Sequence, residues 1–374
     1  MATRVNYTWA CGTAALKMNI LKATKTYEAW LGEQIPLLRA DLALKHQAMH
    51  EAVFPFLRAT FYRWSQTYPK VCEKLMDGPE VLGVGDLHVE NFGTWRDIEG
   101  RLIWGINDFD EACRLPYTVD LVRLSASAIL AGEGEHLPIP HGPACKAILA
   151  GYRAALKTGG RPFALAEDHP KLREMAVHRL REPQAYWDKL KALTTHHDKV
   201  PSSALKALHR QLPDEDLELR IAHRIAGLGS LGRRRYVGLA EWHGGSIARE
   251  AKELAESAWR WARSARARRH IQYQEILDTA IRCPDPFVRQ RGDWIVRRLA
   301  PDCSRIELSA LPKEHDAERL LHAMGFETAN VHLGSCEAKV LSDDLQRRGP
   351  VWLYSAGRAM ADSTLADWQE WRKG

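Results

Sequence analysis

The strongest constraint on the fold of this chain is a short segment, VLGVGDLHVENFG, at residues 81–93. Its apolar first part predicts a buried strand that ends at Asp86. Asp86, His88 and Asn91 then follow within six positions. Taken alone, such a cluster favours a polar turn whose side chains bind their own backbone. A functional site needs a second polar cluster that meets the first.

A β-hairpin is predicted directly after this segment, at residues 93–109. Two apolar stretches flank RDIEG, and Gly100 suits a turn that needs a positive φ. The hairpin returns the chain to Asp108, so a second carboxylate can reach the loop of Asp86 and Asn91. One carboxylate can then orient a substrate hydroxyl, while the amide and the other carboxylate hold Mg²⁺, which prefers oxygen ligands and is often shared with substrate phosphates. The pattern is suited to phosphoryl transfer.

Composition limits the partners and the cell compartment. The 53 basic residues nearly balance the 47 acidic ones, and the net charge of +6 indicates affinity for anionic ligands without requiring nucleic acid. The seven cysteines are odd in number and show no CxxC spacing, so neither a disulfide framework nor zinc is expected. No segment reaches the ~18 apolar residues of a membrane span. The sequence therefore predicts a cytoplasmic protein without a membrane partner.

Three motifs resemble a known group of enzymes. GDLHVEN, GINDFDEA and YTVDLVRL look like the catalytic loop, the metal-binding segment and the following helix of aminoglycoside and choline phosphotransferases, which are relatives of protein kinases. More closely, GVGDLHVENFGTW, NDFDEA, DLVRLSAS, GLGSLGRRRYVGL and AKELAES, in this order, resemble the bacterial family called domain of unknown function 2252. The resemblance implies an α+β, protein-kinase-like two-lobe fold that uses ATP and Mg²⁺.

The resemblance also implies roles for the polar residues of the first cluster. Asp86 would be the catalytic base, or the acid that orients the acceptor hydroxyl. His88 could touch the transferred phosphate. Asn91 and Asp108 would hold Mg²⁺, and Asp110 could be an additional metal ligand.

A second cluster, GLGSLG at residues 227–232, lies about 140 residues later. It fits the dinucleotide fingerprint only superficially, because that fingerprint requires a helix after the glycines and RRRYVGL predicts a strand. A glycine turn between two strands, with a lysine on the next strand, is the kinase arrangement for covering ATP phosphates. A tight hairpin without a ligand is the alternative. The predicted nucleotide-binding residues are Gly227, Gly229, Ser230, Gly232, Lys252 and Glu275, the last as the acid that orients Lys252, with Glu256 as second choice.

The order of the two clusters is unusual. Kinases place the glycine loop and lysine before the catalytic loop, whereas this chain places them after it. If both clusters face one cleft, the fold is a permuted kinase-like arrangement; otherwise the glycine segment is unrelated. Helical and strand periodicity then predict three parts. These are a mainly helical lobe at 1–215 with the catalytic loop and metal-binding hairpin, a smaller β-rich nucleotide-binding lobe at 216–310, and C-terminal helices at 311–374 that pack on the helical lobe.

Other polar residues have weaker signals. Asp120, by the same resemblance, would brace the catalytic loop. Residues 233–235, together with Arg297 and Arg298, could meet an anionic substrate. WRWARSARARRH at 259–270 interleaves tryptophan and arginine, which nucleic-acid sites also do, but the pattern is more typical of a solvated helix face.

The predicted function is transfer of the γ-phosphate of ATP to a hydroxyl of an unidentified small molecule or peptide. The same parts with the nucleotide reversed would transfer AMP instead. A non-catalytic nucleotide-binding pseudokinase, or a basic binding module, is the alternative outside enzymes. The presence of Asp86, Asn91, Asp108 and Lys252 together argues against that alternative, because a binding module needs no base beside metal-binding acids.

Overall fold

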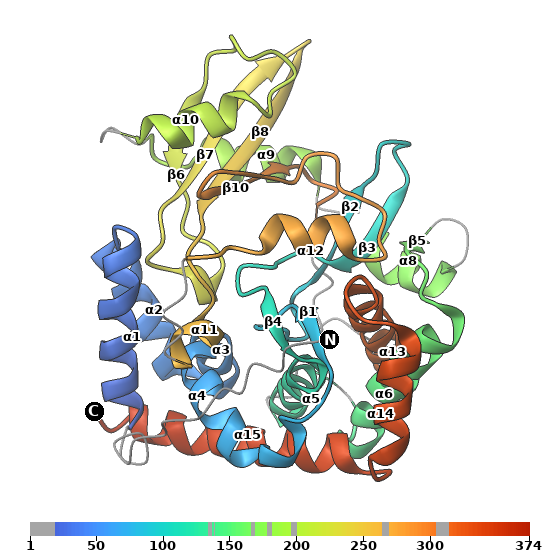
Figure 1. The fold of residues 1–374 in the computed structure, drawn as a ribbon. Coiled ribbons are helices and arrows are strands. Elements are labelled where there is room, and N and C mark those ends of the chain that lie inside the picture. Colours follow the sequence, from blue (N-terminus) through green and yellow to red (C-terminus); the bar gives the residue numbers. More distant parts are fainter. Residues whose placement is uncertain are drawn as a thin grey trace, which may run out of the picture.

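A computed structural model of the molecule shows most of its helices gathered on one side of a large sheet (Figure 1). It describes residues 19–133, 137, 139–165, 169–177, 182–195, 200–263, 269–303 and 314–374. A five-stranded sheet lies at one end, and helices with two smaller sheets form the rest. The α+β class is confirmed, and the kinase-like two-lobe form stays a prediction.

The large sheet has the strand order β6-β7-β8-β10-β9, and all neighbouring strands are antiparallel. The register places Lys252 of β8 beside Arg235 of β7 and Ile295 of β10. The strands of this sheet are β6 (Arg220–His223), β7 (Arg235–Trp242), β8 (Gly245–Glu253), β9 (Arg289–Arg291) and β10 (Trp294–Leu299).

The two faces of the large sheet have different covers, because successive side chains of a strand point to opposite faces. α10 (Ser202–His209) packs on one face around Ala251. α9 (Pro183–Lys191) packs on the other face around Ala248. Lys252 shares the face of Ala248 but lies further along β8, where the sheet approaches the helical region (Figure 1).

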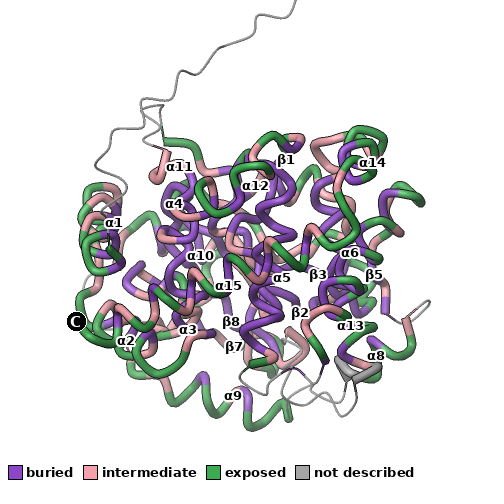
Figure 2. The backbone as a smooth tube through the Cα atoms, turned by 90° about the horizontal axis from the view of Figure 1, so that it is seen from below, coloured by how far each residue is buried: buried purple, intermediate pink, exposed green. Residues whose placement is uncertain are grey.

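The helical region is built around α5 (Tyr117–Glu133). Of its 17 residues, 15 are buried, and Figure 2 shows α5 as a mostly buried helix with other helices around it. A helix that is largely apolar on every side is typical of such a central position. α15 (Trp352–Trp371) packs along α5, and α13 (Glu314–His332) packs along α6 (His141–Thr158).

The first polar cluster lies between two small sheets, as the predicted strand and hairpin require. β1 (Glu80–Gly83) pairs with β4 (Cys113–Pro116), and β2 (Phe92–Arg96) pairs with β3 (Leu102–Ile106), to which β5 (Phe163–Ala164) adds. Gly83 lies opposite Cys113, and Phe92 lies opposite Ile106. The loop after β1 and the loop before β4 therefore run side by side. Gly100 in the hairpin turn has a φ of 74°, which confirms the expected positive value.

The remaining helices confirm most of the helical pattern of the sequence. Two short helices, α11 (Ala258–Ala262) and α12 (Tyr273–Thr279), interrupt the β-rich segment. Residues 1–18 and 304–313 of the predicted parts lie outside the described residues. In the part of the chain that the structure describes, no helix combines the length and apolar character needed to cross a membrane. The other helices are α1 (Ile20–Gln34), α2 (Arg39–Glu51), α3 (Val53–Ala59), α4 (Phe61–Val71), α8 (Pro170–Val177) and α14 (Ala338–Arg347).

Candidate functional site

The loop that follows β1 is held from behind by Asp120, in the first turn of α5. One carboxylate oxygen of Asp120 accepts the Val84 N–H at 2.7 Å and the other accepts the Gly85 N–H at 2.8 Å. The His332 Nε2 atom lies 2.9 Å from the same carboxylate. All three side-chain and backbone contacts are buried, so they fix the loop strongly. The bracing role expected for Asp120 is confirmed.

Gly85 occupies a position that tolerates no side chain. Its φ is 80°, and a Cβ there would lie 2.5 Å from the carbonyl oxygen of Glu111. Gly85→Ala is expected to lower the free energy of unfolding by about 3 kcal/mol, because backbone strain adds to a clash. Gly100→Ala is the matched control, since Gly100 has a similar φ of 74° but open space around it, and should lose only about 1 kcal/mol. Urea unfolding measures both, and equal losses would contradict the clash.

Asp86 directly follows Gly85 and has two differently placed oxygens. Oδ1 accepts hydrogen bonds from Nε and Nη2 of Arg123, at 2.9 and 2.5 Å, and Arg123 is completely buried in α5. Oδ2 lies 3.4 Å from the position of a Cβ at Gly229. Burial raises the pKa of the Asp86 carboxyl, against the lowering effect of Arg123. Asp86 is thus oriented by one oxygen and presents the other to the pocket.

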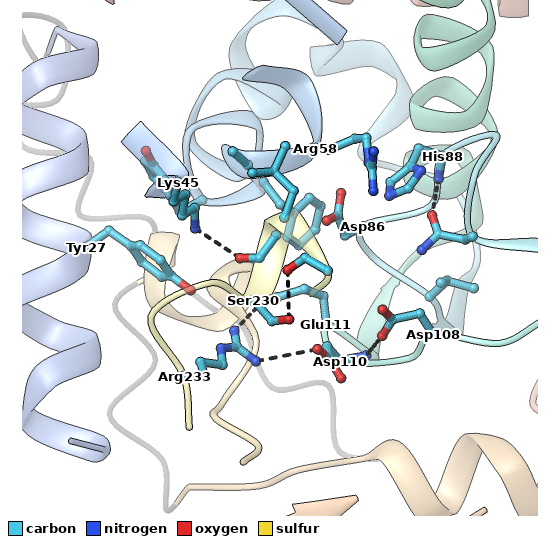
Figure 3. A pocket seen from close by; sticks show the side chains of 18 residues that line it. Tyr27, Lys45, Arg58, Asp86, His88, Asp108, Asp110, Glu111, Ser230 and Arg233 are labelled. Atoms are coloured by element: carbon cyan, nitrogen blue, oxygen red, sulfur yellow. Dashed lines mark hydrogen bonds and ion pairs between the residues drawn. The ribbon is translucent and has the colours of Figure 1, made fainter. Parts of the chain in front are cut away.

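His88 and Asn91 line the same pocket and are linked through the loop backbone. The Asn91 Oδ1 atom accepts the His88 N–H at 2.6 Å, and His88 Nδ1 accepts the Glu90 N–H at 3.2 Å. Figure 3 shows His88 beside Asp86, with its backbone bonded to the asparagine side chain. The structure therefore brings both predicted residues to Asp86.

Asp108 and Asp110 meet Lys252 at the edge of the pocket. The Lys252 Nζ atom lies 2.5 Å from Asp110 Oδ1 and 3.3 Å from Asp108 Oδ1. The Asp110 N–H also donates to Asp108 Oδ1 at 3.3 Å. Burial raises the pKa of Asp110, the charge of Asp108 adds to this, and Lys252 opposes it. One buried cation thus lies between two carboxylates predicted to bind metal.

The glycine segment forms a turn between β6 and β7, and a strand follows it as predicted. Gly227 has a φ of 73° and Gly232 has a φ of 98°. Gly227, Gly229 and Ser230 line the pocket together with Asp86 and Asp108. The Gly232 carbonyl accepts the Leu38 N–H at 2.8 Å, which anchors the turn to the helical region. The two clusters therefore face one pocket although they are far apart in sequence.

Glu275, the predicted orienting acid, does not contact Lys252 in the structure. Its carboxylate accepts a hydrogen bond from Gln272 Nε2 at 2.9 Å and lies 4.0 Å from Arg114. The second choice, Glu256, pairs with Arg260 on α11. The prediction of Glu275 as the partner of Lys252 is therefore wrong, because Lys252 extends from β8 toward Asp108 and Asp110 and not toward α12.

Two cations of the site, the buried Lys45 and the partly buried Arg58, belong to no motif in the sequence. Lys45 on α2 donates to the Gly229 carbonyl at 2.9 Å, and Arg58 on α3 pairs with Glu90 at 2.6 Å. Both line the pocket (Figure 3). Their helices precede the catalytic loop and are read from sequence as ordinary packing elements, so only the tertiary structure shows that they face it.

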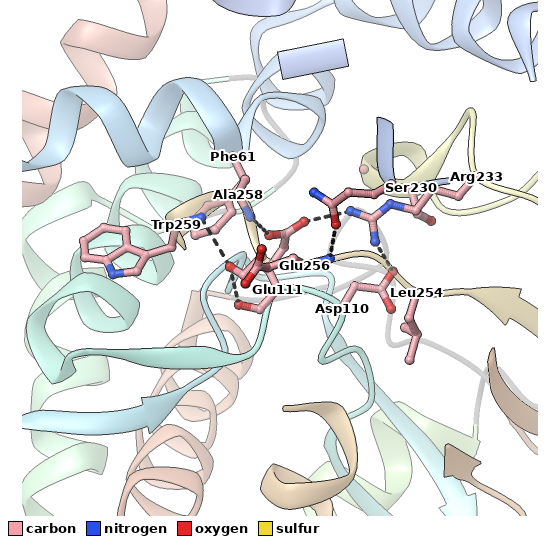
Figure 4. A network of polar contacts seen from close by, with 12 residues as sticks. Phe61, Asp110, Glu111, Ser230, Arg233, Leu254, Glu256, Ala258 and Trp259 are labelled. Carbon is pink, nitrogen blue, oxygen red and sulfur yellow. Dashed lines mark hydrogen bonds and ion pairs between the residues drawn. The ribbon is translucent and has the colours of Figure 1, made fainter. Parts of the chain in front are cut away.

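Glu111 follows the hairpin directly and connects it to the end of the glycine segment. It accepts hydrogen bonds from Arg233 Nη2 at 3.0 Å and from the Ala258 N–H at 2.6 Å, and its carbonyl accepts the Ser257 hydroxyl at 3.0 Å (Figure 4). Burial raises the pKa of Glu111, against the effect of Arg233. Glu111 directly follows NDFD in the sequence, and this position could have indicated that it belongs to the site.

The acids of the pocket fit a cation of the magnesium type. Asp108 and Asp110 supply carboxylate oxygens, and Asn91 lines the same pocket. Among the residues that the structure describes, no group of three or more histidine, cysteine, aspartate or glutamate side chains is arranged to hold a metal ion. Mg²⁺ commonly needs only one or two carboxylates, because water and substrate phosphates complete its shell. The donor set therefore suits a metal that is shared with a substrate.

These observations define a mixed α+β protein with a polar pocket, in which a braced acidic loop meets a glycine turn. A buried strand lysine contacts two acids of this pocket. The chain belongs to the family DUF2252, described as an uncharacterized protein conserved in bacteria, whose model matches residues 37–181 and 166–374. No curated protein and no solved structure is significantly similar to the chain.

Proposed function

We propose that this protein is an ATP- and Mg²⁺-dependent phosphotransferase that transfers the γ-phosphate to a hydroxyl of a small molecule or peptide. One observation carries the proposal: Lys252 pairs with Asp108 and Asp110, although 144 residues separate it from Asp108. An oriented acid and two carboxylates that suit a metal thus line one pocket, and a buried cation contacts the two carboxylates. These are the parts that phosphoryl transfer needs, since its catalysis consists mainly of positioning and charge neutralisation.

The acceptor hydroxyl is assigned to Asp86. Its Oδ1 atom is saturated by Arg123, which leaves Oδ2 to accept the proton of a hydroxyl in the pocket. Because Arg123 and Asp120 fix both the side chain and the loop, Asp86 needs little rearrangement to orient the attacking oxygen. His88 lies beside it as a donor toward the transferred group.

The metal is assigned to Asp108 and Asp110, with the Asn91 amide as a third donor. Bound there, Mg²⁺ would neutralise the phosphate charge that develops during transfer. The metal would supply further positive charge to the two acids, which would free Lys252 to donate to a phosphate oxygen.

The phosphates of the donor are assigned to the sheet side of the pocket. Beside the glycine turn, three arginines, Arg224, Arg235 and Arg297, pair with the buried carboxylate of Glu250 on β8. Arg235 also donates to the Ser230 hydroxyl of the glycine turn at 2.7 Å. Three positive charges on one negative charge leave an excess that favours a polyanion.

Thermal unfolding with ATP tests the metal assignment. ATP is expected to raise the Tm of the protein only when Mg²⁺ is present, because the acids repel phosphate without it. Asp108→Asn should weaken Mg²⁺-dependent ATP binding about tenfold or more, since it removes one metal ligand. Asp278→Asn, an exposed acid on α12, is the control and should bind as the wild type does. Stabilisation by ATP that is independent of Mg²⁺ would overturn the metal assignment.

Labelled nucleotide tests the transfer itself. With a deproteinised cell extract as the acceptor pool, label from the γ-phosphate of ATP is expected to appear on an extract compound. Transfer of label from the α-phosphate would instead identify AMP transfer. Mg²⁺-dependent binding of ATP without transfer of either label would indicate a nucleotide sensor.

A further inference from the structure

Three cationic side chains surround the pocket on the side of the N-terminal helices. Lys45 comes from α2, Arg58 from α3 and Arg233 from the end of the glycine turn. Lys45 and Arg233 are 5% and 4% exposed. Figure 3 shows Lys45 and Arg233 facing the glycine turn from two sides, with Arg58 near Asp86. The mechanism above uses none of these three cations.

Lys45 has no acidic partner in contact with its ammonium group among the described residues. Its Nζ atom donates to the Gly229 carbonyl at 2.9 Å and lies 5.9 Å from the centre of the Tyr62 ring. A buried ammonium without a countercharge is costly, and two of its three donors remain available. Burial correspondingly lowers the pKa of Lys45 to about 8. Such a group is expected where an anionic ligand completes the site.

Both arginines also have buried donors without an acceptor in the described part of the chain. Arg58 pairs with Glu90 through Nη1, whereas its Nε makes no hydrogen bond. Arg233 donates to Glu111 through Nη2, whereas its Nη1 makes no hydrogen bond and lies 4.0 Å from Asp110. Buried donors are normally satisfied, so unsatisfied ones at a pocket point to a missing ligand.

Lys45 lies apart from Asp108 and Asp110, the acids assigned to the metal. Gly229 separates Lys45 from Asp86, with its carbonyl on the lysine and its Cα side toward the aspartate. In Figure 3, Lys45 and Asp108 lie on opposite sides of Asp86. The charged groups that act most strongly on Lys45 are Glu28, Arg233, Glu111 and Asp86.

We propose that Lys45, Arg58 and Arg233 form a subsite for an anionic group, a phosphate or carboxylate, carried by the acceptor. The inference rests on the proposed function, because it places the acceptor hydroxyl at Asp86. The substrate class is then a hydroxyl compound with a negative charge near the phosphorylated position. Three cationic donors match the several acceptor oxygens of such a group.

Inorganic phosphate is the probe, because its binding needs neither turnover nor a known acceptor. Phosphate is expected to raise the Tm of the wild type, and Lys45→Met should reduce its affinity about tenfold or more. Arg39→Met, which removes an exposed cation from the same helix, is the control and should leave the shift unchanged. Equal phosphate binding by Lys45→Met and the wild type would overturn the subsite.

The unliganded stability of Lys45→Met separates loss of a ligand contact from misfolding. Because the variant removes an uncompensated buried cation, its Tm without phosphate should equal or exceed that of the wild type. A fully folded variant that has lost phosphate binding supports the subsite. A variant with a much lower Tm would show that Lys45 serves packing, which would contradict the inference.

Saturating nucleotide identifies the source of the anion. If the anion belongs to the acceptor, phosphate should still bind in the presence of Mg²⁺ and a non-hydrolysable ATP analogue. Competition between the two would instead assign the three cations to the terminal phosphate of the donor and overturn the acceptor assignment. Failure of the analogue to bind at all, with phosphate binding intact, would contradict the proposed function but not the anion subsite.

Discussion

Asp86→Asn is expected to lower phosphate transfer from ATP about 10²- to 10⁴-fold, the contribution typical of a positioned base. The asparagine oxygen can still accept the hydrogen bonds of Arg123, so the side chain stays in place. Its NH₂ group, however, cannot accept a hydroxyl proton at the pocket. ATP affinity should change little, because the donor is held on the sheet side. Transfer of γ-label and ATP binding are measured on the same preparation.

The matched control is Asp362→Asn, which changes an exposed acid that pairs with Arg358 on α15. It should transfer phosphate at the wild-type rate. The Tm of Asp86→Asn reports whether the buried pair with Arg123 still supports the fold. A folded variant with unchanged transfer would remove Asp86 from the mechanism.

Asp120→Ala is expected to have the largest effect on stability, a loss of about 3–5 kcal/mol in the free energy of unfolding. The substitution leaves the buried Val84 and Gly85 N–H groups without acceptors and removes the carboxylate next to His332. Each such orphaned group costs roughly 1–3 kcal/mol. Since a domain is stable by only about 5–15 kcal/mol, the variant should unfold at markedly lower urea concentration.

Asp362→Ala provides the comparison for this loss as well, since an exposed pair contributes about 0–1 kcal/mol. Asp120→Asn should be intermediate, because one oxygen remains as an acceptor. If Asp120→Ala unfolds at the same urea concentration as Asp362→Ala, the loop is not held by this carboxylate.

The sequence predicted those parts of the site that depend on local patterns. The apolar run before Asp86, the turn at Gly100 and the strand after Gly232 are each read from neighbouring residues. The structure confirms the turn and both strands, although β1 ends at Gly83 and not at Asp86. Glycine at a positive φ and alternating apolar residues are local signals of this kind.

Residues that reach the pocket from distant helices could not be predicted. Lys45, Arg58 and Arg123 lie in helices whose periodicity indicates packing, and only the way these helices cross places their charges at Asp86. Glu275 was predicted as the partner of Lys252 because it lies on the next predicted helix. The register of β8 instead directs the lysine to Asp108 and Asp110.

The sequence does not show whether the two polar clusters share one pocket. The contacts of the glycine turn show that they do. Gly229 lies against Asp86, and Lys252 on β8 contacts the acids that follow the hairpin. The permuted, kinase-like character of this arrangement stays a prediction. The shared pocket itself is a property of the described residues.

A crystal structure with Mn²⁺ and a non-hydrolysable ATP analogue would show whether the two acids, Lys252 and the glycine turn bind one metal–nucleotide complex. We expect an anomalous metal peak bound by Asp108 and Asp110, with analogue phosphates in contact with Lys252 and the glycine turn. Asp86 should face the terminal phosphate from the other side. A nucleotide bound elsewhere, or phosphates in this pocket without metal at the two acids, would contradict the proposed phosphotransferase site.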